Sequence, residues 1–179
     1  MENMEEKLKK ALQAMDKEDY RASFEIFQPL AEQGHAKAQF HLGFLYRIGR
    51  GVNQDFQKAY HWYSLAAEQG YAEAQYKVGL MHFKGQVVAK DYQKAFQWYS
   101  LAAEQGDAMA QSNLGHLCVE RQTGNQDFIQ AHKWFNIAGA NEDGEGHKNR
   151  EAVEKLMTPD QITEAQRLAR EWTEEHGKN

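Results

Sequence analysis

The chain repeats itself every 36 residues, and this period constrains its fold more than any other feature. Four aspartates mark the period, and each is followed by an aromatic residue: Asp19, Asp55, Asp91 and Asp127. Residues 55–72 and 91–108 are identical at fourteen of their eighteen positions. Self-similarity at a period of roughly 20 to 50 residues is typical of stacked-repeat proteins, in which each unit buries its apolar face against its neighbours. The period therefore predicts a repeat protein.

Each unit is predicted to be a pair of helices. In residues 55–69 the small and apolar positions recur at helical spacing, and Asp55 is a suitable N-cap. Gly70 follows where a positive φ is needed, and a second helical pattern covers residues 72–85. Two helices joined by so short a turn must lie antiparallel. Every repeat is thus expected to be an αα-hairpin, with helix A after the aspartate and helix B after the turn.

The predicted fold class is all-α, an α-α superhelix of about four 36-residue repeats. The 179 residues are divided into an N-terminal capping helix, four repeats and a C-terminal capping helix with a tail. The expected bounds are 1–18 for the first helix, 19–54, 55–90, 91–126 and 127–157 for the repeats, and 158–179 for the last part.

The last helix is expected to cover the open end of the repeat array. Thr158 is placed as N-cap, Pro159 as the first helical residue and Gln161 as the partner in a capping box. The helix should run from about residue 159 to 174. Its apolar face would consist of Ile162, Ala165, Ala169 and Trp172.

Equivalent positions in the repeats carry equivalent residues. Gly43, Gly79 and Gly115 recur midway along helix B, where a glycine costs about 1 kcal/mol relative to alanine. Their repetition predicts close helix crossings. The aromatic positions of helix A are interpreted as core, although a ligand platform is the alternative: Trp62, Trp98 and Trp134 share one position with Ile26, and Tyr63, Tyr99 and Phe135 share the next with Phe27.

Two departures from the pattern are expected to alter the backbone. Pro29 occupies the position of Leu65 and Leu101, where it removes a helical N–H, so helix A of the first repeat should kink or end early. Arg121 stands where the second repeat has Gly85, so the loop around it should differ in shape.

Composition excludes several classes of protein. The net charge is −5 and the basic residues form no run, which argues against nucleic-acid binding. No stretch approaches the roughly 18 apolar residues of a membrane span, so no membrane insertion is expected. Cys118 is the only cysteine, and the first residues lack the apolar centre of a signal peptide. A cytoplasmic location is expected, or a periplasmic or secreted one if a signal peptide has been removed.

Motifs for catalysis or metal binding are missing from the sequence. The eight histidines form no i, i+3 or i, i+4 pair and no HExxH, and GxSxG, SxxK and GxxxxGK[ST] are absent. Residues 141–145 are interpreted as a solvated linker rather than a calcium loop. Cys118 is interpreted as a small core residue rather than a reactive thiol. We expect no catalytic residue, no metal, no cofactor and no enzymatic activity.

The repeat motif resembles the Sel-one-like repeat family. Residues 72–85, AEAQYKVGLMHFKG, and 94–111, KAFQWYSLAAEQGDAMAQ, carry the resemblance, which extends from residue 19 to about 175. It implies TPR-like αα-hairpins and a bacterial protein that serves as an adaptor or scaffold. Some members are cysteine-rich and were linked with β-lactams, so an envelope protein that binds or acts on β-lactams or peptidoglycan is the alternative function. The cysteines of that subgroup are absent here.

The candidate binding site is a polar stripe along each helix A, because its residues change from repeat to repeat. The resemblance to TPR-like stacks implies that helix A lines the concave side, so the stripes would form one ladder that binds a protein or peptide partner. The chain itself is expected to be a monomer. The alternative is that the stripes are merely a solvated helix face. The candidate residues are Arg21, Glu25, Gln57, His61, Gln93, Gln97, Lys133 and Asn136, and Gln28, Ser64, Ser100 and Ile129 complete the stripes.

Overall fold

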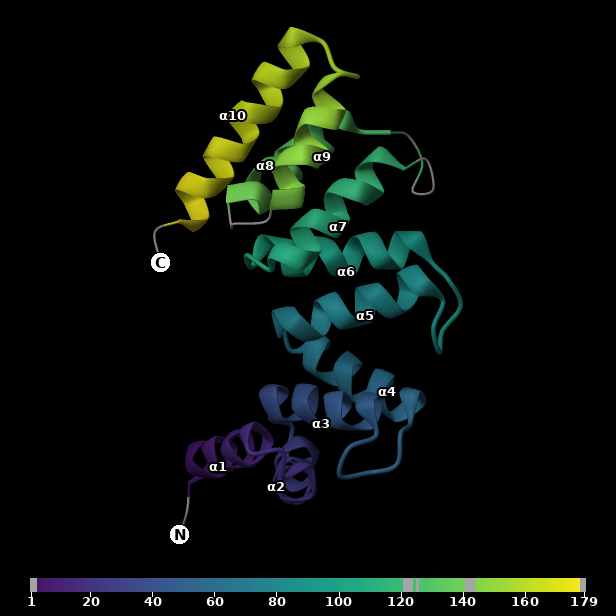
Figure 1. Cartoon of the computed structure of the whole chain (residues 1–179), viewed down its shortest axis with the longest axis vertical. Coiled ribbons are helices and arrows are strands. Elements are labelled where there is room, and N and C mark those ends of the chain that lie inside the picture. The colour runs from purple at the N-terminus through teal and green to yellow at the C-terminus, as the bar shows by residue number, and fades with distance from the viewer. Residues whose placement is uncertain (1–2, 121–123, 125, 141–143, 178–179) are drawn as a thin grey trace. The chain divides into compact units, whose positions relative to one another are not determined.

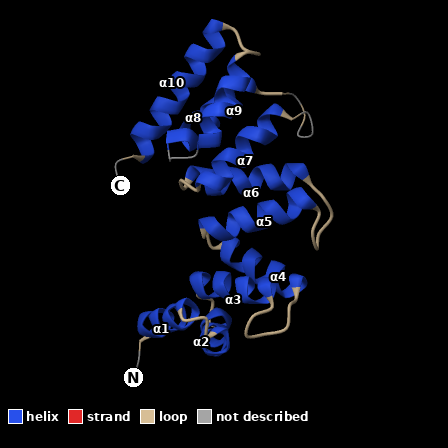
Figure 2. Cartoon of the chain, viewed as in Figure 1, coloured by secondary structure: helices blue, strands red, loops and turns tan. Residues whose placement is uncertain are grey.

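The structure is a computed structural model that describes residues 3–120, 124, 126–140 and 144–177. Within these residues it contains ten helices and no strand. Figure 1 labels the helices, and Figure 2 shows helices joined by loops. The predicted all-α fold class is confirmed. The helices fall into two compact units, Met1–Ala89 and Lys90–Asn179, which are described separately.

The N-terminal unit consists of an additional helix followed by repeated helix pairs. The additional helix, α1, packs against α2, and the buried hydroxyl of Ser23 donates a hydrogen bond of 3.0 Å to the carbonyl oxygen of Ala11. The helices are α1 (Met4–Asp16), α2 (Tyr20–Glu32), α3 (Ala36–Ile48), α4 (Phe56–Glu68) and α5 (Ala72–Lys84).

The C-terminal unit continues the alternation of helix A and helix B and ends with a longer helix. Its helices are α6 (Tyr92–Glu104), α7 (Ala108–Val119), α8 (Phe128–Ala140), α9 (Gly144–Glu154) and α10 (Pro159–His176). Consecutive helices of the unit pack together as α6 on α7, α7 on α8 and α8 on α9, whereas α10 packs against α8.

The predicted N-cap at Asp55 and the predicted turn glycine at Gly70 are confirmed. All four periodic aspartates cap a helix A: each side chain accepts a hydrogen bond from the backbone N–H three residues later, over 3.1 Å at Asp19 and 2.9 Å at Asp55, Asp91 and Asp127. Gly70 adopts a φ of +87°, as the turn between the helices requires. The period in the sequence is therefore a period of helix starts.

The repeated glycines of helix B allow an aromatic ring of the next helix A to approach. A Cβ atom added at Gly43 would lie 2.9 Å from Cδ1 of Tyr63, and one added at Gly115 would lie 2.7 Å from Cε1 of Phe135. The repeated glycines had suggested a close approach of two helix backbones. At these two glycines the close approach exists, but the nearest neighbour is an aromatic side chain rather than backbone.

The second aromatic position of helix A forms the core. Phe27, Tyr63, Tyr99 and Phe135 are almost completely buried. The position before it is less uniform, because Ile26, Trp62 and Trp98 are half-buried whereas Trp134 is buried. The interpretation as core is thus confirmed for one position, and the other opens onto the surface in three of the four repeats.

A buried glutamine on helix B links it to the end of the preceding helix A. The side-chain amide of Gln39 donates to the carbonyl oxygen of Ala31 at 3.2 Å, and Gln111 donates to Ala103 at 3.1 Å. Gln75 repeats the contact with Ala67 at 3.2 Å. These bonds fix the same geometry of the helix pair in the first three repeats, whereas the fourth has His147 at this position.

The early end expected at Pro29 does not occur. Helix α2 continues to Glu32 and has the same 13 residues as α4 and α6. Pro29 is exposed and lies in the last turn, so its missing N–H removes one hydrogen bond on the solvated side of the helix. The loop around Arg121 and residues 141–143 of the expected linker lie outside the described residues.

Candidate functional site

The polar stripe of the N-terminal unit is exposed. Arg21 and Glu25 lie on α2 and form an ion pair with 3.3 Å between Nε and Oε1. Gln57 and His61 lie on α4, and the His61 ring contacts the edge of the neighbouring Trp62 at a centroid distance of 5.2 Å. The four predicted residues of this unit are therefore accessible to a partner.

The stripe of the C-terminal unit is exposed on α6 and partly covered on α8. Gln93 and Gln97 are exposed. Lys133 is half-buried and its Nζ lies 4.2 Å from the centroid of the Trp134 ring. Asn136 is half-buried, and its Oδ1 accepts a hydrogen bond of 3.2 Å from Arg150 on α9. The last candidate residue therefore already has a partner within the chain.

An apolar pair lies beside the polar stripe on α4, α6 and α8. Its tryptophan was interpreted from the sequence as core, with a ligand platform as the alternative, and its second residue was not considered for binding. We call the pair formed by the first aromatic position and the residue three later the apolar slot: it consists of Trp62 and Leu65 on α4, Trp98 and Leu101 on α6, and Trp134 and Ile137 on α8. Leu101 is 50% exposed, whereas Ile137 is only 4% exposed. We call the polar stripe together with the apolar slot the helix-A face.

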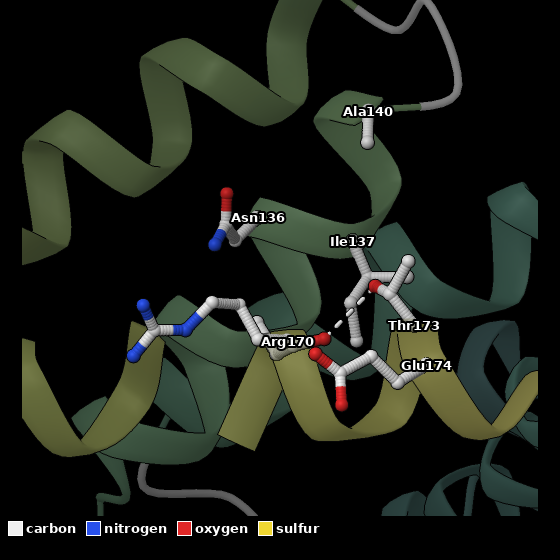
Figure 3. Close-up of a pocket in the computed structure, with 7 residues that line it drawn as sticks. Asn136, Ile137, Ala140, Arg170, Thr173 and Glu174 are labelled. Carbon is white, nitrogen blue, oxygen red and sulfur yellow. Dashed lines mark hydrogen bonds between the residues drawn. The ribbon is translucent and has the colours of Figure 1, made fainter. Parts of the chain in front are cut away.

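Helix α10 is the reason why the slot on α8 is buried. Trp172 of α10 meets Trp134 edge to face at a centroid distance of 6.0 Å. Figure 3 shows Asn136, Ile137 and Ala140 of α8 opposite Arg170, Thr173 and Glu174 of α10. These residues line a shallow cavity of about 270 Å³. The helix-A face of the last repeat is thus occupied by a helix of the same chain.

A second cavity, of about 520 Å³, lies where α10 reaches the end of α6. There the Trp172 indole N–H donates to the Glu104 carboxylate, and the ring of His176 stacks on Trp172 at a centroid distance of 4.2 Å. His176 Nε2 lies 3.6 Å from the same carboxylate. The contact joins α10 to α6 as well as to α8.

The predicted start of α10 is confirmed. Thr158 and Gln161 form a capping box, and Pro159 is the first helical residue. Of the predicted apolar face, Ala165 and Ala169 are buried, whereas Ile162 and Trp172 are half-buried. The helix packs on α8 through a face of small residues that ends in a tryptophan.

Two residues whose side chains could take part in catalysis or metal binding, Cys118 and His132, are buried. Cys118 is buried, as predicted, and burial raises the pKa of its thiol to about 12. The imidazole of His132 is fully buried and lies 2.8 Å from a carboxylate oxygen of Glu154, which joins α8 to α9. Among the described residues, no group of three His, Cys, Asp or Glu side chains is arranged to hold a metal ion.

The helices of the described part offer no membrane span, since none combines sufficient length with sufficient apolar character.

A comparison with protein families finds four consecutive copies of the Sel1 repeat, at residues 13–35, 36–71, 72–107 and 108–143. The family's repeat starts on helix B, whereas the division proposed from the sequence starts on helix A, and the period of 36 residues is common to both. No curated protein matches the chain.

Two solved structures share the fold. A Sel1 repeat protein from Oxalobacter formigenes is 30% identical with a TM-score of 0.76, and the match covers 80% of this chain and 57% of that protein. The protein c5321, described as a protective antigen present in uropathogenic Escherichia coli strains displaying an SLR fold, is 29% identical with a TM-score of 0.56. That match covers 87% of this chain and 41% of the antigen, so the chain spans about half the length of these relatives or less.

Proposed function

Because the chain belongs to the Sel1 repeat family, we propose that it is a non-enzymatic scaffold that binds a protein or peptide partner on its helix-A face. The observation that carries the proposal is the uncovered apolar slot beside a polar stripe whose residues change between repeats. Leu101 is half exposed in the third repeat, whereas its counterpart Ile137 is covered by a helix in the fourth.

The composition of the helix-A face suits protein recognition. Tryptophan and leucine side chains that are half exposed contribute apolar area to an interface, and tryptophan is enriched among the residues that dominate binding energy. Side chains with hydrogen-bonding groups surround the slots: Gln57 and His61 on α4, and Gln93 and Gln97 on α6. An apolar centre with a polar border is the usual arrangement of a protein interface.

The proposal includes a cytoplasmic location and a monomeric state. The lone, buried Cys118 supports the location, since proteins in oxidising compartments commonly form disulfides. The alternative of an envelope protein that acts on β-lactams or peptidoglycan gains no support from the family or from the two relatives.

A pull-down from the native host tests the proposal. The tagged full chain should retain a partner that a variant with His61→Glu and Lys133→Glu loses, because both new charges stand on the polar stripe of the helix-A face. A second variant, Gln97→Lys, changes only an exposed side chain and should weaken retention as well. Circular dichroism would show that both variants stay folded.

Matched controls lie on helix B. Glu73→Lys on α5 and Met109→Glu on α7 also change the charge of exposed side chains, and both should retain the partner. Loss of the partner from these controls, with retention by the helix-A variants, would place binding on another face and refute the proposal.

A further inference from the structure

We propose that the helix-A face of the second repeat binds an amphipathic α-helix that shares the packing pattern of α10, namely two small residues four positions apart and a tryptophan three positions later, but that carries a basic residue directly after the tryptophan, where α10 has Thr173. This inference rests on the proposed function and identifies the class of partner.

The packing of α10 on α8 shows which kind of element fills an apolar slot. Ala165 and Ala169 are buried in this contact, so the two helices approach closely. Trp172 lies one turn further and covers Trp134. With α10 in place, Trp134 and Ile137 are only 5% and 4% exposed. A helix with small residues and one large aromatic residue therefore completes this surface.

The second repeat presents the same surface in the N-terminal unit. Helices α2, α3 and α4 correspond to α6, α7 and α8, and their contacts match in detail: Gln39 bonds to Ala31 as Gln111 bonds to Ala103. The slot of Trp62 and Leu65 on α4 is therefore the counterpart of the slot that α10 covers. Both of its residues are half-buried rather than buried.

The anchor for the tryptophan is also repeated. Trp172 donates its indole N–H to Glu104, which lies at the end of α6. The counterpart of Glu104 two repeats earlier is Glu32, an exposed residue at the end of α2. One oxygen of its carboxylate accepts a hydrogen bond of 2.9 Å from Gln28 on the same helix, and the other remains for the tryptophan. A tryptophan docked beside Leu65 would therefore find the carboxylate of Glu32 where Trp172 finds that of Glu104.

One difference between the repeats sets the charge of the partner. Ala140 of α8 lines both cavities together with Thr173 of α10. Its counterpart on α4 is Glu68, which is exposed. A helix docked on α4 thus meets a carboxylate where α10 meets a methyl group. A basic residue at the position of Thr173 would pair with Glu68, whereas an acidic one would be repelled.

The third repeat is a poorer site because its glutamate is already engaged. The counterpart of Ala140 on α6 is Glu104, whose carboxylate accepts the hydrogen bond from Trp172. A second helix on α6 would have to compete with α10 for this group.

Fluorescence anisotropy with two labelled peptides tests the inference on the full chain. The probes are an acetylated, amidated peptide of residues 158–177 and the same peptide with Thr173→Arg. We expect saturable binding of both, with the arginine peptide at least five-fold tighter because of Glu68. Leu65→Glu in the chain should weaken binding of the arginine peptide at least ten-fold. Glu68→Gln should make the affinities for the arginine peptide and the unmodified peptide equal.

The variant Leu101→Glu is the matched control, since it places the same charge at the equivalent exposed position of α6. It should change the affinity for the arginine peptide by less than two-fold relative to the wild-type chain. Binding that is lost with Leu101→Glu or Ile137→Glu but not with Leu65→Glu would mean that the peptide docks in the C-terminal unit, and this would overturn the inference.

Two experimental outcomes distinguish a wrong class of partner from a wrong proposed function. If neither peptide binds, but Leu65→Glu abolishes retention of the native partner in the pull-down, the helix-A face is the binding surface and the inferred class of partner is wrong. If the peptides bind as expected and the helix-A variants still retain the native partner, the proposed function fails while the docking site stands.

Discussion

The indole Nε1 of Trp172 donates a hydrogen bond of 2.6 Å to the carboxylate of Glu104, although 68 residues separate the two in sequence. The contact is partly exposed, so the bond itself contributes only about 1 kcal/mol. Its position is more important than its strength, because it sets where along α6 and α8 the last helix ends. The larger contribution comes from the apolar side chains that α10 covers.

Truncation before Thr158 is expected to destabilise the protein. Without α10, the buried side chains of Trp134 and Ile137 become exposed, which costs about 2 kcal/mol for each. We expect the melting temperature to fall by about 8 to 16 °C, or the truncated chain to aggregate. A chain that ends after His176 is the control and should melt like the full chain. An unchanged melting temperature after the longer truncation would show that α10 is a tail and not a cover.

Gly115→Ala is expected to destabilise the protein by about 1 to 3 kcal/mol, although alanine is the better helix former. The new methyl group would lie 2.7 Å from Cε1 of Phe135, which is fully buried and cannot move away freely. Urea unfolding measures the change. Adding Phe135→Leu should recover part of the loss, so the double-mutant cycle should show a favourable coupling. Simple additivity would mean that the ring is not what the glycine accommodates.

The stability of the protein is expected to rise with pH between about 4 and 6.5 partly because of His41. Burial, with a smaller effect of the Lys37 charge, lowers the pKa of His41 from 6.5 to about 4, and its ring stacks on Phe27 at 5.0 Å. The unfolded chain therefore binds a proton in this range that the folded chain does not. The contribution of the neutral ring to the free energy of unfolding is fully present above pH 6.5 and is lost as the pH falls toward 4.

His41→Gln should flatten this part of the stability profile. One proton accounts for at most about 1.4 kcal/mol per pH unit, so urea unfolding at pH 4.5, 5.5 and 6.5 can resolve the difference between the variant and the wild type. His61→Gln is the matched control for the substitution itself, since it replaces an exposed histidine. Equal slopes for wild type and His41→Gln would contradict the role assigned to His41.

The repeat pattern predicted the helices well because their ends depend on local chemistry. An aspartate that accepts from the N–H three residues later and a glycine with positive φ act within a few residues, so Asp55, Gly70 and the capping box of Thr158 could be identified without tertiary structure. Pro29 was misjudged because the cost of a proline depends on its exposure and on the number of turns that follow it.

The binding surface could be predicted only in part because it depends on which helix covers which. The polar residues Gln57, His61, Gln93 and Gln97 are exposed, as an interface would require. The apolar slot went unrecognised because Trp62 and Leu65 have the pattern of core residues. A signal did exist: Ala140 replaces the glutamate of the other repeats at the place where α10 docks.

Cys118 is expected to be unreactive in the folded protein. Its thiol is buried, and burial, assisted by the nearby charge of Asp127, raises its pKa to about 12 while Lys133 lowers it slightly. Because the thiolate is the nucleophile, only about one molecule in ten thousand would carry it at pH 8. Iodoacetamide at pH 8 should therefore leave the native chain unlabelled over an hour and modify Cys118 completely in guanidinium chloride, as intact-mass measurement would show.

The variant Cys118→Ser provides the blank, since it must stay unlabelled under both conditions. Stoichiometric labelling of the native chain would instead identify Cys118 as an accessible thiol and revive the reactive-thiol interpretation of this position.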